Sequence, residues 1–371
     1  GGKQPQICFS LLDFLRAYAS MQSSPASPSM PVSTNKTPAI KNAILFGNGL
    51  MRTLGSPSSP DLLKQTICSR PCGECAGSYC PFTEEKDCLP FPLIYEYLIL
   101  KEQKQYQEKN MRAISAMMRE KLKKQLERFT PQNHPESVLH ALADLRADDY
   151  LTTNYDTFLH RILELRDYEQ AASQNSETKY SIRRHVLMRK QETSHSCRLW
   201  NIHGTYNDRP DSFTIQYGYE HYCGCIGKID NYLKGTYTYQ LRKKEISIPP
   251  MYKKLQDDKL RKGESWIDLF FFSNVHILGL NLSPEEIDLL YILNLRSRWL
   301  RDPKIKNRIR NRIVFYGQPT NAVKALLKQF SVEVRSSSPK PPGKNAEKQA
   351  YENYYKRVLK VIKSGMQQSE N

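Results

Sequence analysis

Short apolar runs recur along the chain, and each of them stops at a glycine or at polar residues. Apolar runs of about four to eight residues, bounded by turn-forming residues, are typical of buried strands. The runs that we predict as strands cover residues 42–46, 149–152, 181–188, 198–202, 275–280, 312–316 and 331–334. The pattern therefore predicts a sheet of short, buried strands.

Between these runs, apolar residues recur every three or four positions, which predicts amphipathic helices. One helix start is marked by Ser283 as the N-cap, Pro284 in the first position and Glu286 three residues after the cap. The expected helices cover residues 8–20, 93–108, 111–129, 135–145, 157–165, 266–272, 283–295, 320–330 and 346–363. Strands alternate with helices through most of the chain, which indicates an α/β fold with a doubly wound, Rossmann-like parallel sheet and helices on both faces.

Changes in composition divide the chain into three parts. We expect an N-terminal helix and a Ser/Pro-rich linker in residues 1–40, and a Rossmann-type domain in residues 41–335. A basic linker and a C-terminal helix follow in residues 336–371. Residues 208–265 are rich in Tyr and Lys and show no clear period, so no element is predicted there.

The bulk composition indicates a soluble protein of the cytoplasm. No run approaches the roughly 18 apolar residues of a membrane-spanning helix. No signal peptide is visible, and the nine cysteines are an odd number, as expected where thiols stay reduced. The net charge of +17 favours polyanions as partners, namely nucleic acid, phosphate-bearing cofactors or an acidic protein, although a solvated basic surface would give the same count.

A Cys-rich insertion covers residues 68–88. Its cysteines are Cys68, Cys72, Cys75, Cys80 and Cys88. Four thiolates could hold a zinc ion tetrahedrally, but the spacing contains one C-x2-C pair instead of the two pairs of a zinc ribbon. Free thiols are therefore favoured over zinc, and disulfides are the third alternative.

A basic segment covers residues 304–312, where Lys and Arg alternate with Ile305 and Ile309. Such a segment is a candidate surface for nucleic acid or an acidic partner. The alternative, which we weigh more heavily, is a solvated edge whose isoleucines pack inward.

Four short motifs each follow a predicted strand. They are Gly47-Asn48-Gly49, Thr152-Thr153-Asn154-Tyr155-Asp156, His203-Gly204 and Gly279-Leu280-Asn281-Leu282-Ser283. Open α/β sheets bind ligands beyond the carboxyl ends of their strands. The four motifs are therefore candidates for one binding site.

Each motif carries residues suited to a nucleotide. Gly47 and Gly49 would let backbone N–H groups approach a phosphate. Asn154 is both donor and acceptor and could orient a water or a ribose hydroxyl, from which Asp156 could also accept. His203 could act as a general base near neutral pH.

Each motif also has a structural alternative. The glycines could form an ordinary tight turn, and Asn154 or Asp156 could cap the helix expected in residues 157–165. A single histidine such as His203 is more often a structural residue, and residues 279–283 could be no more than a strand-to-helix turn.

In this order, and with Asp288 after the last of them, the four motifs resemble those of the sirtuin-like family. In particular they are similar to the bacterial anti-phage sirtuin-like domains that cleave NAD, and more distantly to the AbiH-like abortive infection group. The resemblance covers roughly residues 40–335. It implies a Rossmann-type domain with NAD as its substrate.

The resemblance also implies a role for each motif. Asn154 would orient the ribose or an attacking water, Asp156 would support it, and His203 would act as the base. The residues implied in NAD binding are Gly47, Asn48, Gly49 and Thr153 near the pyrophosphate and ribose, and Gly279, Asn281 and Ser283 on the adenosine side.

Three departures from the sirtuin pattern narrow the activity. The Gly-rich loop lacks the downstream Pro-Asp-Phe-Arg, and Asn281 stands where sirtuins have Ser. Sirtuin deacetylases carry a four-cysteine zinc module after the His-Gly motif, whereas this chain has only Cys223 and Cys225 there. These departures weaken the deacetylase interpretation and favour hydrolysis of NAD.

The resulting hypothesis is an NAD+ glycohydrolase that gives nicotinamide and ADP-ribose, or cyclic ADP-ribose, and acts in anti-phage defence by depleting NAD. Such an enzyme must be held inactive until triggered, so we expect a homo-oligomer or a sensor or activator partner, and no membrane association. Two alternatives are a non-catalytic module that senses NAD or ADP-ribose and a basic nucleic-acid-binding protein.

Overall fold

The computed structural model describes residues 40–56, 62–64, 89–105, 111–128, 137–171, 180–205, 215–336, 339–343 and 346–368. Residues 40–371 belong to one compact unit. An N-terminal helix and linker were expected in residues 1–40, and all of these except residue 40 lie outside the described residues, as do the five cysteines of the Cys-rich insertion.

The core of the fold is an eight-stranded sheet with the strand order β10-β9-β8-β1-β2-β5-β4-β3. Its strands are β1 (Asn42–Phe46), β2 (Asp149–Thr152), β3 (Tyr168–Ala171), β4 (Val186–Lys190), β5 (Ser196–Asn201), β8 (Asn274–Leu278), β9 (Ile313–Tyr316) and β10 (Glu333–Arg335). The six strands from β10 to β5 pair in parallel, and β4 and β3 extend the sheet antiparallel. The predicted α/β class is confirmed.

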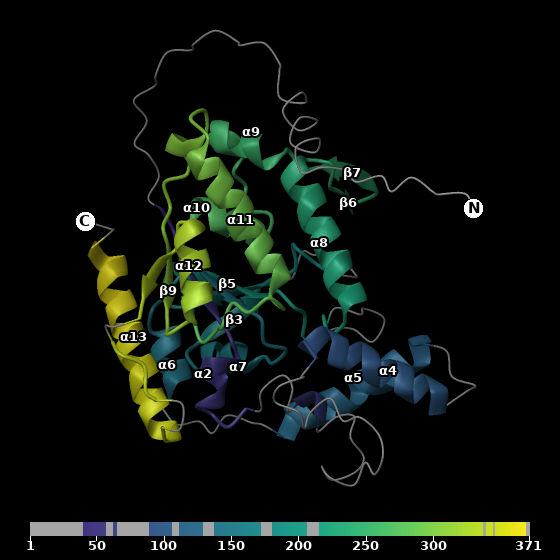
Figure 1. Ribbon diagram of the computed structural model, residues 1–371. Helices are drawn as coiled ribbons and strands as arrows, with labels where there is room; N and C mark the ends of the chain where they lie inside the picture. The colour runs from purple at the N-terminus through teal and green to yellow at the C-terminus, as the bar shows by residue number, and fades with distance from the viewer. Residues whose placement is uncertain are drawn as a thin grey trace, which may run out of the picture. The chain divides into compact units, whose positions relative to one another are not determined.

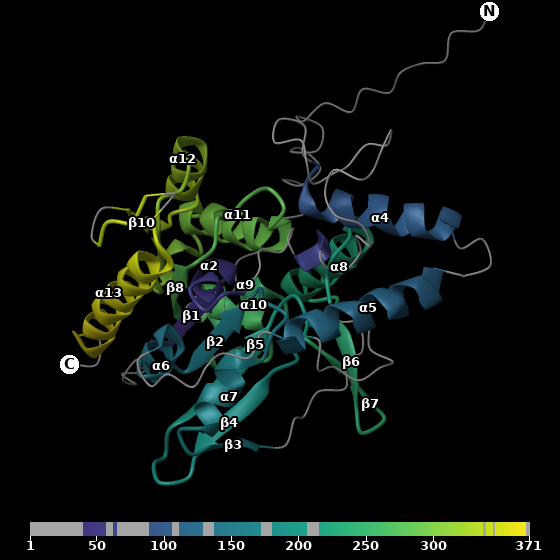
Figure 2. The ribbon, with the colours of Figure 1, turned by 90° about the horizontal axis from the view of Figure 1, so that it is seen from below.

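Helices cover both faces of the sheet (Figures 1 and 2). One face packs against α8 (Tyr219–Lys234), α9 (Met251–Gln256), α10 (Trp266–Phe272), α11 (Ile287–Arg301) and α12 (Asn321–Gln329). The other face packs against α2 (Asn48–Arg52), α6 (Val138–Ala143), α7 (Phe158–Glu164) and α13 (Lys348–Gln368). Alternate residues of β1 enter the two cores, because successive side chains of a strand point to opposite faces.

The other elements are a helical pair, a hairpin and two single turns. A helical pair, α4 (Phe91–Gln105) and α5 (Met111–Arg128), builds a third apolar cluster. A separate hairpin joins β6 (Thr238–Leu241) to β7 (Lys244–Ser247). Single turns η1 (Asp258–Leu260) and η2 (Lys306–Arg308) complete the described elements. No described helix combines the length and the apolar character needed to cross a membrane.

Some predicted elements need correction. The strand expected in residues 181–188 is Val186–Lys190, and it runs antiparallel beside β3, which was not predicted. Residues 208–265, which gave no prediction, contain α8, α9 and the β6–β7 hairpin. The Tyr-rich helix α8 was missed because tyrosine serves equally well in a strand and on a half-buried helix face.

The predicted helix start at Ser283 is wrong. Leu282 adopts a left-handed conformation with φ of 48°, and the Glu286 N–H donates to the Ser283 carbonyl in a turn. The helix α11 begins only at Ile287. This late start places Asp288 in the first turn of the helix, beside the carboxyl ends of the strands.

Candidate functional site

The four motifs leave the sheet at neighbouring strand ends. Phe46, the last residue of β1, pairs with Leu278 on one side and with Thr152 on the other. Thr152 in turn pairs with Asn201, the last residue of β5. The strands β2 to β5 lie on one side of β1, and the later strands β8 to β10 lie on the other side. The motifs therefore lie at the topological switch point, where open α/β sheets place ligands.

The glycines of the first and last motifs pack against each other. The Gly49 N–H donates to the Gly279 carbonyl at 2.9 Å, and the Gly47 N–H donates to the Leu278 carbonyl at 3.1 Å. A Cβ atom at Gly47 would overlap the side chain of Leu280, and one at Gly49 would lie 2.8 Å from the Gly279 oxygen. Close backbone packing therefore requires these glycines, and their contact with a pyrophosphate stays a prediction.

Asn201 ties the Asn154 motif to the end of β5. Its Nδ2 donates to the backbone carbonyls of both Asn154 and Asp156, each at 3.0 Å. The Asn154 N–H donates to Oγ1 of Thr152 at 3.0 Å. Sequence reasoning missed Asn201, although an amide at the end of a buried strand, two residues before His203, was a usable signal.

The side chain of Asn154 is buried at 8% exposure, and its Nδ2 has no hydrogen-bond partner. Buried amide donors are nearly always satisfied in folded proteins. The N-cap residue of α7 is Thr157, three residues after Asn154. The unpartnered donor makes Asn154 the residue of the motif best suited to a polar ligand.

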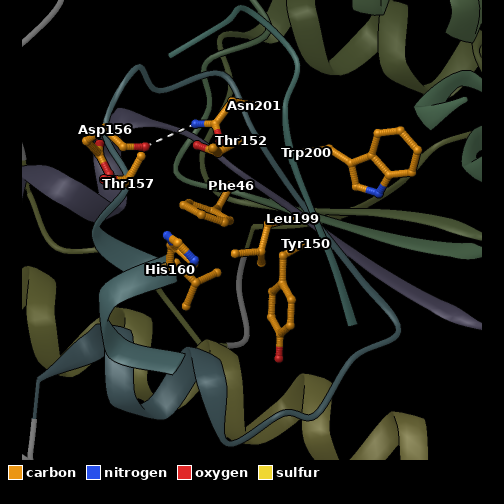
Figure 3. A pocket seen from close by; sticks show the side chains of 10 residues that line it. Phe46, Tyr150, Thr152, Asp156, Thr157, His160, Leu199, Trp200 and Asn201 are labelled. Carbon is orange, nitrogen blue, oxygen red and sulfur yellow. Dashed lines mark hydrogen bonds between the residues drawn. The ribbon is translucent and has the colours of Figure 1, made fainter. Parts of the chain in front are cut away.

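Asp156 combines a structural contact with an unusual charge environment. Its Oδ1 accepts the Phe158 N–H at 3.1 Å at the start of α7, so the capping alternative holds for this residue. Burial raises the pKa of its carboxyl to about 6. The hydrogen bond from the Phe158 N–H lowers this pKa, but by less than burial raises it. Asp156 also lines a small pocket of about 20 Å³ with Thr152, Asn201 and His160, and Figure 3 shows the bond from Asn201 at its edge.

His203 is paired with a buried carboxylate. Its Nε2 lies 2.9 Å from Oδ2 of Asp288, and the two residues are 3% and 0% exposed. Burial alone would lower the pKa of the imidazole, but the charge of Asp288 and the hydrogen bond outweigh it, and the net pKa is raised. The ring of Tyr222 packs edge-on against His203 at 5.5 Å between centroids. The sequence placed His203 and Asp288 in separate motifs, and the structure brings them into contact.

Two more acceptor atoms near His203 have no partner. Oδ1 of Asp288 and Oε2 of Glu286 are both excluded from water without a hydrogen bond. Burial raises the pKa of Glu286 to about 7, with His203 acting in the opposite direction. Sequence reasoning used Glu286 only as a helix-start signal and missed its place beside the histidine.

Residues 215–217 form hydrogen bonds with two of the motifs. The Gln216 N–H donates to the His203 carbonyl at 2.9 Å, and the Tyr155 hydroxyl donates to the Gln216 carbonyl at 2.9 Å. Tyr155 and Tyr217 enter the apolar cluster of the α4–α5 pair. The helical pair therefore rests on the same strand ends as the candidate site.

The remaining predicted site residues lie at the same edge with less burial. Asn48 opens α2 and is half-buried, as are Thr153 and Ser283, whereas Asn281 is exposed. Within the described part of the chain, no three His, Cys, Asp or Glu side chains form a group that could hold a metal ion. Cys223 and Cys225 both lie on α8, one exposed and one buried, and neither forms a disulfide.

The geometry at these strand ends can be set beside known families. Residues 148–246 match the family model of the SIR2-like domain. The matched region runs from the residue before β2 into β7, so it holds both the Asn154 motif and His203. The SIR2-like domain supports a relation to the sirtuin-like family and an NAD-related activity. No curated protein matches the chain.

Proposed function

We propose that this protein is an NAD+ glycohydrolase that cleaves the bond between nicotinamide and ribose. The observation that carries the proposal is that the SIR2-like region contains Asn154 and His203 on neighbouring strand ends, with Asn201 joining the two. The products would be nicotinamide and ADP-ribose, or a cyclised form of the latter.

The polar atoms of the site fit such a substrate. Asn154 offers a buried donor, and Asp288 and Glu286 offer buried acceptors, none of them with a partner in the protein. Ribose hydroxyls both donate and accept, so they complement this set. Leaving such groups unpaired costs about 1–3 kcal/mol each, which a bound ribose or ordered water would recover.

The reaction needs little more than positioning and one base. As the C–N bond breaks, nicotinamide leaves with the electron pair and positive charge develops on the ribose. A water held by Asn154 then attacks the ribose carbon and gives its proton to the neutral imidazole of His203. The carboxylate of Asp288 stabilises the imidazolium that forms, so NAD+ and water yield nicotinamide, ADP-ribose and a proton.

We also propose that the activity depletes NAD in anti-phage defence. The order of the four motifs supports this assignment, and the two lone cysteines of α8 support hydrolysis over zinc-dependent deacetylation. Because uncontrolled depletion would harm the host cell, we expect the protein to act in the cytoplasm as a homo-oligomer or with a sensor partner.

The test is an NAD-consumption assay on the purified full chain, beside a mass measurement of the native assembly. Asn154→Ala and His203→Ala should each abolish turnover. Asn154→Ala should keep the wild-type melting temperature within a few degrees, whereas His203→Ala should lower it, because it leaves the buried carboxylate of Asp288 without its partner. His195→Ala is the matched control, since His195 directly precedes β5 whereas His203 follows it. Full turnover by both site variants would refute the assignment, and NAD binding without turnover in every assembly would indicate a sensor module instead.

A second candidate function is nucleic-acid binding by the basic segment. Ile305 and Ile309 are buried there, while Lys306, Arg308 and Arg310 are exposed on the outside. The pKa of Arg261 is lowered by burial and then by Arg310 and Arg308, with Asp258 opposing, so these cations share one surface. Binding of a 20-nucleotide DNA that weakens steeply with salt would support this function, and its absence near physiological salt would exclude it.

A further inference from the structure

Tyr155 lies between Asn154 and Asp156, yet its side chain takes no part in the proposed reaction. The side chain is buried, and its hydroxyl donates to the Gln216 carbonyl at 2.9 Å. Burial raises the pKa of this hydroxyl far above its usual range, so the group stays protonated and remains a donor. The candidate site therefore contains a buried tyrosine hydroxyl with one specific acceptor, 61 residues away in the sequence.

Gln216 connects this contact to the backbone of His203. Its N–H donates to the His203 carbonyl at 2.9 Å, and its side-chain Nε2 donates to the Ile202 carbonyl at 3.2 Å. A second link runs in parallel, since Oγ1 of Thr205 donates to the Tyr155 carbonyl at 3.0 Å. Hydrogen bonds that share buried residues in this way hold a segment in one arrangement.

The ring of Tyr155 joins this network to the helical pair. It packs against Tyr217 at 5.2 Å between ring centres, and Tyr217 stacks on Tyr95 at 5.2 Å with an interplanar angle of 17°. Tyr95 lies on α4, and all three rings belong to the apolar cluster of the α4–α5 pair. Aromatic pairs in such geometries attract each other beyond the burial of their surface. A displacement of α4 would therefore reach Tyr155 through two ring contacts.

The α4–α5 pair precedes the region that matches the SIR2-like domain. The two helices cover residues 91–105 and 111–128, whereas the match begins at residue 148. Through Tyr155, which lies inside the match, the pair packs directly on the Asn154 motif. It is therefore placed to influence the candidate site from outside the matched region.

We propose that Tyr155 is a positioning residue that couples the α4–α5 pair to His203. Its hydroxyl holds Gln216, and Gln216 holds the backbone from which the imidazole of His203 projects. A displacement of about 1 Å in a reacting group can cost about 100-fold in rate, so a contact of this kind is sufficient to affect kcat. The inference rests on the proposed NAD cleavage, because turnover is its first readout.

The test compares the steady-state kinetics of Tyr155→Phe and Tyr354→Phe with those of the wild-type full chain. Tyr155→Phe removes only the hydroxyl, and it should lower kcat about tenfold while KM for NAD stays within about twofold. Tyr354→Phe is the matched control, since Tyr354 is also buried but its hydroxyl has no hydrogen-bond partner among the described residues. The control should leave both constants unchanged.

A double substitution tests the connection to α4. Tyr95→Leu removes the ring that stacks on Tyr217, and it should lower kcat about threefold. Because Tyr95 acts through Tyr155, the double variant Tyr95→Leu/Tyr155→Phe should be no slower than Tyr155→Phe alone. Two effects that multiply would show that the two residues act independently, which would overturn the coupling.

Amide hydrogen exchange, followed by mass spectrometry, separates this inference from the proposed function. Exchange in residues 215–217 should be faster in Tyr155→Phe and Tyr95→Leu than in the wild type, and unchanged in Tyr354→Phe. This result without any NAD turnover by the wild type would refute NAD cleavage and support the coupling. Turnover by the wild type with an unchanged kcat in Tyr155→Phe would overturn the inference and leave the proposed function intact, and unchanged exchange in Tyr155→Phe would overturn it as well.

Discussion

Asp156→Asn should stabilise the protein at neutral and alkaline pH. The carboxyl of Asp156 is 6% exposed, and burial raises its pKa from 3.8 to about 6. Asparagine removes the charge but keeps the side-chain oxygen that accepts the Phe158 N–H at 3.1 Å. The substitution therefore isolates the cost of the buried charge from the benefit of the contact with α7.

The size of the effect follows from the two pKa values. Because the folded state holds its proton more tightly than the unfolded chain, the contribution of Asp156 to stability is fully present below about pH 4. It is lost as the pH rises through about 6. A difference between 3.8 and about 6 corresponds to about 3 kcal/mol at pH 8.

The assay is urea unfolding of wild type and variant at pH 4 and pH 8. Asp156→Asn should match the wild type within about 1 kcal/mol at pH 4 and exceed it by about 2–3 kcal/mol at pH 8. Asp156→Ala is the control, since it also loses the acceptor for Phe158 and should gain about 1 kcal/mol less. A stability difference between Asp156→Asn and wild type that does not depend on pH would refute the reasoning.

Three more substitutions test other contacts. Asp288→Asn should let the pKa of His203 fall, which moves the acidic limb of the kcat–pH profile of NAD cleavage to lower pH and lowers kcat about 100-fold. Gly279→Ala should cost at least about 1–3 kcal/mol in thermal unfolding, because residue 279 has φ of +68° and a Cβ atom would lie 2.8 Å from a backbone nitrogen. Lys254→Met should cost about 3–5 kcal/mol in urea unfolding, because it leaves the buried carboxylate of Asp268 without its ammonium partner at 3.2 Å.

Each of these predictions has its own control. An unmoved acidic limb in Asp288→Asn would show that His203 is not the base. Gly227→Ala, at a helical glycine without neighbours, should gain up to about 1 kcal/mol where Gly279→Ala loses stability. Adding Asp268→Leu to Lys254→Met should restore part of the lost stability, and no recovery would argue against an unpaired charge as the cause.

The central strands could be predicted from the sequence because their signal is local. β1 and β2 occupy residues 42–46 and 149–152, the same bounds that the apolar runs gave. Their carboxyl ends carry the predicted motifs, and the strand register places them side by side. A parallel strand buried on both faces is one continuous apolar run, so its ends are visible without any tertiary information.

The contacts inside the site could not be predicted in the same way. The pairing of His203 with Asp288 depends on a left-handed Leu282 that delays α11, and the cap signal at Ser283 pointed to an earlier start. Asn201 donates its two hydrogen bonds to backbone carbonyls. Every residue type has a backbone carbonyl, so the sequence does not show which residues accept these bonds. Here long-range packing, and not the local helix-start signal, determines where α11 begins.

The position of β1 also governs how this chain can fold. β1 is the first described strand, yet it lies inside the sheet between β2 and β8, and Asn42 pairs with Asn274, which is far from it in the sequence. Such non-local pairing makes folding slow, since a long loop must close before its contacts form. On the ribosome, β1 must therefore wait with one open edge until residues 274–278 have emerged, and a chain that stops before them exposes that edge to aggregation.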